Sequence, residues 1–134
     1  MLVLADDMNK NTIGIYGNKD AKTPNIDRLA SQGMLFNSCY TATAMCAPTR
    51  TMLFTGLYPI RSGVYANHNS VKDGTKSIAH YLKDLGYRVG INGKRHIGPG
   101  EAFPFESLGD NRQSNYIDGP KKLVVDAAAQ GVPW

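Results

Sequence analysis

The stretch "CYTATAMCAPTRTMLFTG", residues 39–56, holds both cysteines of the chain and the signals of a helix. Pro48 fits the first turn of a helix, and Gly56 fits the left-handed residue that ends one. We therefore predict a helix over "PTRTMLFT" with Cys46 at its N-terminus, where backbone N–H groups favour anions and activate a thiol. The alternative for Cys46 is a buried structural cysteine. For Cys39, inside a predicted strand, we expect that structural role.

The segments on either side of this stretch alternate between strand and helix patterns. The fully apolar run at 1–5 predicts a buried strand. Residues 34–40 and 87–93 predict two further strands. Capping residues, apolar stripes and glycine stops predict helices at 23–33, 48–55, 75–86 and 120–131. This alternation is typical of an α/β protein with a mostly parallel sheet. Three strands cover both faces of such a sheet poorly, so we expect the front part of a longer fold.

Composition excludes several classes of protein. The 134 residues are 42% hydrophobic and 19% charged, which is ordinary for one globular domain. The net charge of +4 suits anionic ligands, but its scattered lysines and arginines do not predict nucleic-acid binding. No apolar run reaches the ~20 residues of a membrane span, and the acidic pair that follows residue 5 does not fit a signal peptide. Two cysteines make no disulfide framework.

Polar residues follow each predicted strand, and in an open α/β sheet ligands bind at these carboxyl ends. Asp6 and Asp7 end the first strand, Cys46 to Arg50 follow the second, and Lys94 and His96 follow the third. We expect these groups to share one pocket.

Each of these groups also has a simpler explanation. Adjacent carboxylates repel unless a cation lies between them, so the Asp pair predicts Ca²⁺ or Mg²⁺; the alternative is a loop or helix cap. Arg50 could reach towards residue 46 or pair on the surface. We expect His68, in a polar loop, and His80, on a helix, to be structural.

The motif "CAPTRTMLFTG" resembles the signature of the type I, formylglycine-dependent sulfatases: Cys, any residue, Pro, Ser or Thr, Arg, then a helix ending Leu-x-Thr-Gly. The blocks "LVLADDMNKNTIGIYGN", "TPNIDRLASQGMLFNSCY", "TGLYPIRSGVY" and "LKDLGYRVGINGKRHIG" stand in the family's order over residues 2 to 100. The run "GKRHIGPGEAFPF" is most similar to the heparan N-sulfatase (sulfamidase) branch. The resemblance implies an alkaline-phosphatase-like fold, a mixed, mostly parallel sheet flanked by helices. Residues 1–134 would form the N-terminal portion of one catalytic domain whose C-terminal remainder is absent.

The resemblance also implies a role for each matching residue. Cys46, oxidised to formylglycine by a separate maturation enzyme, would be the nucleophile and a metal ligand. Asp6 and Asp7 look like the first two ligands of a Ca²⁺ ion, with Mg²⁺ as the alternative. Three further positions, Arg50, Lys94 and His96, resemble the residues that hold the modified side chain, bind the sulfate and remove a proton. The implied reaction is hydrolysis of a sulfuric ester or sulfamate, on a sulfated small molecule or glycan. Family members are periplasmic, secreted or lysosomal.

The chain departs from the family pattern in its later part. The family takes further metal ligands and a general acid from later strands, and Asp110-Asn111 imitates one ligand pair but comes early and in an irregular segment. Ca²⁺ takes six to eight oxygens, so we expect residues 1–134 to be inactive alone. Two other functions stay open: a phosphonate or phosphate ester hydrolase of the same superfamily, and a non-catalytic anion-binding α/β domain.

Overall fold

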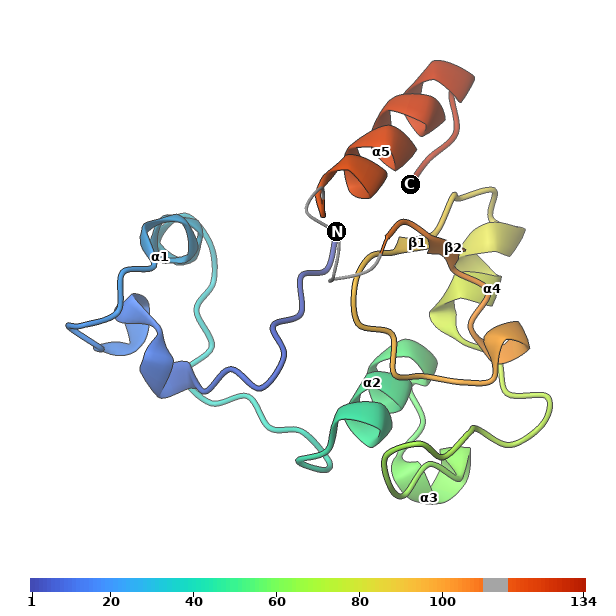
Figure 1. The fold of residues 1–134 in the computed structure, drawn as a ribbon, viewed down its shortest axis with the longest axis horizontal. Helices are drawn as coiled ribbons and strands as arrows, with labels where there is room; N and C mark the ends of the chain where they lie inside the picture. Colours follow the sequence, from blue (N-terminus) through green and yellow to red (C-terminus); the bar gives the residue numbers. More distant parts are fainter. Residues whose placement is uncertain (110–115) are drawn as a thin grey trace. The chain divides into compact units, whose positions relative to one another are not determined.

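The structure is a computed structural model that describes residues 1–109 and 116–134 (Figure 1). It consists of two compact units, Met1–Thr41 and Ala42–Trp134. The pair Asp110-Asn111 lies outside the described residues.

The first unit is built from two 3-10 turns and one helix. The turns η1 (Lys10–Thr12) and η2 (Gly14–Tyr16) precede helix α1 (Pro24–Ser31), which confirms the helix predicted at 23–33. Asp27 joins these elements, because its Oδ1 accepts the Ile15 N–H at 2.8 Å and the Thr23 hydroxyl at 3.0 Å.

The two strands predicted in this unit are wrong. Residues 1–5 and 34–40 form no strand, and Val3 and Phe36 are 79% and 62% exposed. An isolated strand leaves its backbone N–H and C=O groups unpaired. The structure describes all of residues 1–41 and assigns no strand among them to supply partners. The buried, structural role expected for Cys39 is also wrong, since this residue is exposed.

The second unit contains the remaining helices. They are α2 (Cys46–Thr55), α3 (Pro59–Ser62), α4 (Ile78–Asp84), the turn η3 (Gly100–Ala102) and α5 (Asp118–Gln130). The predictions at 48–55, 75–86 and 120–131 are confirmed with shifted ends. Ser77 caps α4 through a capping box with His80, which gives His80 the structural role expected for it. Short α3 lies between the helices predicted at 48–55 and 75–86, where the sequence predicted no helix.

The sheet consists of two short parallel strands. β1 (Gly90–Ile91) pairs with β2 (Glu106–Ser107) in the register Gly90 to Glu106 and Ile91 to Ser107. β1 lies within the predicted strand 87–93, whereas the sequence predicted no strand at β2. The pair agrees with the parallel strand pairing predicted for an α/β protein. Within this unit α5 lies at one end and α2 and α3 at the other, with the sheet between them (Figure 1).

A hydrophobic core holds α2 in place. Its buried members are Ala47, Val64, Val71, Ala102 and Phe103, and Phe54, Ile97 and Phe105 pack against them. Phe54 of α2 meets Phe105 edge to face, with ring centroids 5.2 Å apart. Because Ala47 belongs to the core, the first turn of α2 is anchored directly beside Cys46.

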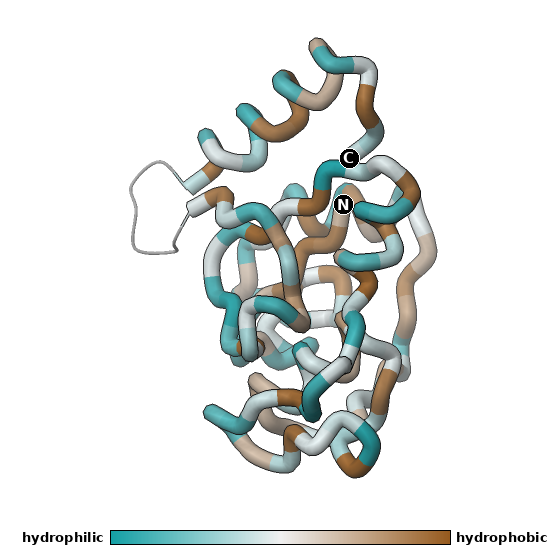
Figure 2. The backbone as a smooth tube through the Cα atoms, turned by 90° about the vertical axis from the view of Figure 1, so that its right-hand side faces the viewer, coloured by the Kyte–Doolittle hydropathy of each residue, from teal (hydrophilic) through white to brown (hydrophobic). Residues whose placement is uncertain are grey.

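An ionic cluster connects the segment before β1 with β2 and α5. Arg88 donates two hydrogen bonds to the Glu106 carboxylate, at 3.1 and 2.6 Å, and these lower the pKa of that carboxyl. Asp126 of α5 lies 3.9 Å from Arg88 and 2.8 Å from Lys122. Along α5 hydrophilic stretches alternate with hydrophobic ones (Figure 2), and Leu123 and Ala127 are its buried residues. Among the described residues, no helix has the length and apolar character needed to cross a membrane.

Candidate active site

Helix α2 places Cys46 at its first position. The preceding residue, Met45, is extended and supplies no side-chain cap. The Ala47 N–H donates instead to Oδ1 of Asn67 at 3.0 Å, a residue 20 positions further along the chain. Helix ends need such partners because their first N–H groups have none within the helix. Cys46 itself is partly exposed, at the edge of the core and accessible to a ligand.

The ammonium group of Lys94 lies beside the thiol. Lys94 Nζ is 3.5 Å from Cys46 Sγ, across 48 residues of sequence. A cation at this distance favours negative charge on the sulfur or on a group bound there. Two residues predicted to share a pocket are thus in contact.

Arg50 is hydrogen-bonded to the backbone of Lys94. Its side chain is buried, with 6% of the residue exposed, which excludes the surface pairing considered from the sequence. Its Nη1 donates to the Lys94 carbonyl oxygen at 2.8 Å. Since the hydrogen bond goes to the backbone of Lys94, Arg50 fixes the position from which the Lys94 ammonium reaches Cys46.

His96 follows two residues later in a sterically restricted conformation. Its φ is 47°, in the left-handed region, and both ring nitrogens are buried. The His96 ring packs against the His68 ring with centroids 5.0 Å apart and a tilt of 54°. His68, at φ 70°, is left-handed as well. Non-glycine residues seldom adopt this region, although histidine is among those enriched there.

Asp6 and Asp7 lie in the first unit and are exposed. A carboxylate oxygen of Asp6 lies within 4.8 Å of one of Asp7, and Asp7 has a φ of 51°. Two oxygen donors this close fit a hard divalent cation such as Ca²⁺. The predicted location at the end of a strand is wrong, because residues 1–5 form none.

Two polar neighbours of the site escaped the sequence reasoning. Asn67 caps α2, and His68, expected to be only structural, packs on His96. The available signal was weak: an Asn-His pair in a polar loop, far in sequence from both partners. Only the folded loop brings them next to Cys46 and His96.

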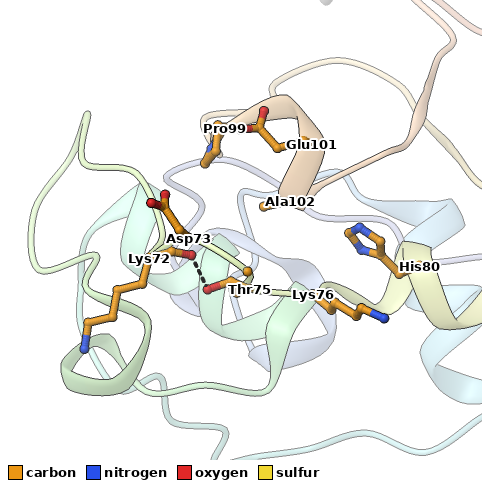
Figure 3. Close-up of a pocket in the computed structure, with 9 residues that line it drawn as sticks. Lys72, Asp73, Thr75, Lys76, His80, Pro99, Glu101 and Ala102 are labelled. Carbon is orange, nitrogen blue, oxygen red and sulfur yellow. Dashed lines mark hydrogen bonds between the residues drawn. The ribbon is translucent and has the colours of Figure 1, made fainter.

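A separate hollow of about 290 Å³ lies beside α4 and η3 (Figure 3). Its lining residues are Lys72, Asp73, Gly74, Thr75, Lys76, His80, Pro99, Glu101 and Ala102. The Lys72 and Lys76 ammonium groups point to opposite sides, and the carboxylates of Asp73 and Glu101 lie above both in this view (Figure 3). The lining of this hollow therefore carries both positive and negative side chains, and they do not converge on one binding point.

Comparisons with known proteins agree with these features. The family model described as Sulfatase matches residues 1–126. The Ulvan-active sulfatase of Formosa agariphila is 43% identical over 103 residues, which cover 77% of this chain and 21% of that protein. Human N-acetylgalactosamine-6-sulfatase is 36% identical, covering 73% and 21%. Human N-sulphoglucosamine sulphohydrolase is 37% identical, covering 79% and 22%, and represents the branch indicated by residues 93–105. The chain spans about a fifth of the length of these relatives.

Proposed function

The chain belongs to the sulfatase family, and we propose that the protein hydrolyses sulfate esters or sulfamates of a sulfated carbohydrate, with formylglycine made from Cys46 as its nucleophile. The observation that carries this proposal is the contact between Lys94 Nζ and Cys46 Sγ at 3.5 Å. The sulfur marks the position at which the formylglycine side chain would stand. A fixed cation at that point is what a transferring sulfuryl group, with negative charge on its oxygens, requires.

The residues of the second unit have separate roles in the proposed reaction. The Lys94 ammonium binds a sulfate oxygen and neutralises part of its charge. Arg50, through the Lys94 carbonyl, keeps that ammonium from moving away from residue 46. The N-terminus of α2 adds backbone N–H groups and the positive end of the helix dipole. His96, whose ring nitrogens are buried, holds and releases the proton of the nucleophile.

The proposed reaction also needs a modified residue, formylglycine, and a divalent metal ion. Formylglycine, produced by a formylglycine-generating or equivalent enzyme, supplies an electrophilic carbonyl whose hydrated form is a nucleophile. Asp6 and Asp7, with residue 46, would hold Ca²⁺, or Mg²⁺ in its place; such an ion polarises oxygen and makes bound hydroxyl groups more acidic. Ca²⁺ takes six to eight oxygens, so we also propose that residues outside 1–134 complete the coordination and supply the general acid. From the family we propose that the whole catalytic domain has an alkaline-phosphatase-like fold and that this chain forms its N-terminal portion.

The names of the relatives support a glycan substrate. They act on ulvan, on N-acetylgalactosamine 6-sulfate and on N-sulphoglucosamine, as their names state. We propose the same substrate class, sulfated sugars, for this protein.

The full-length protein, co-produced with a formylglycine-generating enzyme, tests the proposal. We expect mass spectrometry to show Cys46 converted to formylglycine and the protein to hydrolyse an aryl sulfate faster than an aryl phosphonate. Faster phosphonate hydrolysis would favour the other hydrolases of the superfamily. A folded, fully converted protein that hydrolyses neither ester would refute the enzyme function and favour a non-catalytic anion-binding domain.

A further inference from the structure

The segment between Val64 and Val71 is held at both ends. Val64 and Val71 are 1% and 5% exposed and belong to the core. The Val71 N–H donates to the Gly98 carbonyl at 3.0 Å, and the Lys72 N–H donates to Ser62 at the same distance. We call residues 65–70 the clamp loop. Its ends are anchored, so its middle residues have defined positions.

One middle residue of the clamp loop completes the N-terminus of α2. Asn67 Oδ1 accepts the Ala47 N–H at 3.0 Å, while Met45 offers that helix end no side chain. The amide that Asn67 satisfies belongs to the residue directly after Cys46. Loss of this hydrogen bond would let the first turn of α2 open and residue 46 move with it.

The next residue of the clamp loop touches the other side of the site. The His68 ring lies against the His96 ring at 5.0 Å, and both residues have positive φ values of 70° and 47°. A left-handed backbone at two non-glycine residues persists only where the surroundings hold it in place. His68 is itself exposed, so burial of its ring in the core does not explain the contact.

We propose that Asn67 and His68 form a clamp that sets the position of the nucleophile relative to its base. Asn67 holds residue 46 through the first turn of α2, and His68 holds the His96 ring through packing. Both are positioning residues, and the inference rests on the proposed function. One short loop reaches both groups, so a shift in the loop changes their separation, and a misplacement of ~1 Å can cost ~100-fold in rate.

The Asn67 contact is tested by Asn67→Ala, Asn67→Asp and, as a matched control, Asn69→Ala in the same loop. In the full-length, converted protein we expect Asn67→Ala to lower kcat by about 10- to 100-fold with KM changed less than about threefold. Asn67→Asp keeps an acceptor oxygen and should retain most of kcat. Hydrogen–deuterium exchange at the Ala47 amide should speed up in Asn67→Ala but not in Asn69→Ala. Equal loss of kcat in Asn69→Ala would show a general loop effect and overturn the proposal.

The His68 contact is tested by a pair of variants that separate backbone from ring. Asn tolerates the left-handed conformation, so His68→Asn removes the ring alone, and His68→Phe restores an aromatic ring without its nitrogens. We expect His68→Asn to lower kcat about tenfold at unchanged Tm and His68→Phe to recover most of it. A His68→Phe enzyme as slow as His68→Asn would show that the ring nitrogens, not packing on His96, matter, and would overturn the clamp.

These outcomes are distinguishable from failure of the proposed function. A wild-type protein with residue 46 fully converted but no sulfate hydrolysis would refute the function, and with it the catalytic purpose of the clamp. An active wild type in which Asn67→Ala and His68→Asn keep the wild-type kcat would refute the clamp alone.

Discussion

The two apolar segments that flank the chemistry of this chain fold in opposite ways. The sequence predicted a buried strand at residues 1–5 and a helix at residues 48–55, and only the helix forms. A helix pairs its N–H and C=O groups within itself, so its neighbours need only cover one face. A strand depends on a second strand that can come from anywhere in the chain. Local signals therefore predict helices better than strands in this protein.

The same contrast separates the two units. In the second unit Ala47, Val64, Val71, Ala102 and Phe103 form a buried cluster. In the first unit, all of whose residues are described, Ile13 is the buried hydrophobic residue. We expect the second unit to hold its site geometry through packing and the first through local hydrogen bonds such as those of Asp27.

The largest effect on kcat is expected at Cys46 in the second unit, and Cys39 in the first unit provides the control. Cys46→Ala should lower kcat more than about 1,000-fold because it removes the proposed nucleophile. Cys39→Ala, at an exposed site in the first unit, should leave kcat and Tm unchanged. Initial rates on an aryl sulfate with the full-length protein measure both. A Cys46→Ala enzyme with substantial activity would contradict the assigned nucleophile.

A smaller change, about 100-fold in the affinity for Ca²⁺, is expected from the Asp pair of the first unit. Asp7→Asn removes one carboxylate charge, and we expect the affinity for Ca²⁺ to fall by about 100-fold. Calcium titration of the chelator-stripped full-length protein, followed by Tm and by rate, gives the affinity. Asp20→Asn, also in the first unit, is the control and should leave it unchanged. Unaltered affinity in Asp7→Asn would remove Asp7 from the proposed ligands.

The packing contrast is tested with one phenylalanine from each unit. Phe103, 1% exposed, lies in the core, and its replacement by Ala should cost about 3–4 kcal/mol of unfolding free energy. Phe36, 62% exposed, should cost less than about 0.5 kcal/mol. Denaturant unfolding of the full-length variants measures both values. A large loss for Phe36→Ala would show that this residue packs against other parts of the protein.

The smallest effect concerns the Glu106 carboxylate. Its pKa is lowered by hydrogen bonds from Arg88, so its stabilising contribution is present above the unfolded pKa of ~4.3 and is lost as pH falls through the lower folded value. The Tm difference between wild type and Glu106→Gln should thus be constant near neutral pH and shrink below about pH 4. Exposed Glu101→Gln is the control. A difference that grew on acidification would have the wrong sign for a depressed carboxyl pKa.

The ends of the helices could be predicted from the sequence alone. Gly56 and Gly131 end α2 and α5 in the left-handed conformation, with φ of 70° and 65°, as their positions predicted. Ser77 caps α4, two residues after the predicted start of this helix at residue 75. The short strand β2 was missed because two residues, Glu106 and Ser107, carry no periodic pattern, and its existence depends on β1.

The sequence by itself determined the family, the helix ends and the residue types that carry the proposed chemistry, because these depend on motifs and on contacts between near neighbours. The tertiary structure decided which of those residues meet. It placed Lys94 on Cys46, directed buried Arg50 to the Lys94 backbone, and introduced Asn67 and His68 as neighbours of the site. These contacts join residues 20 to 48 positions apart. No local pattern encodes such pairs, because they arise only when the core formed around Phe103 brings the segments together.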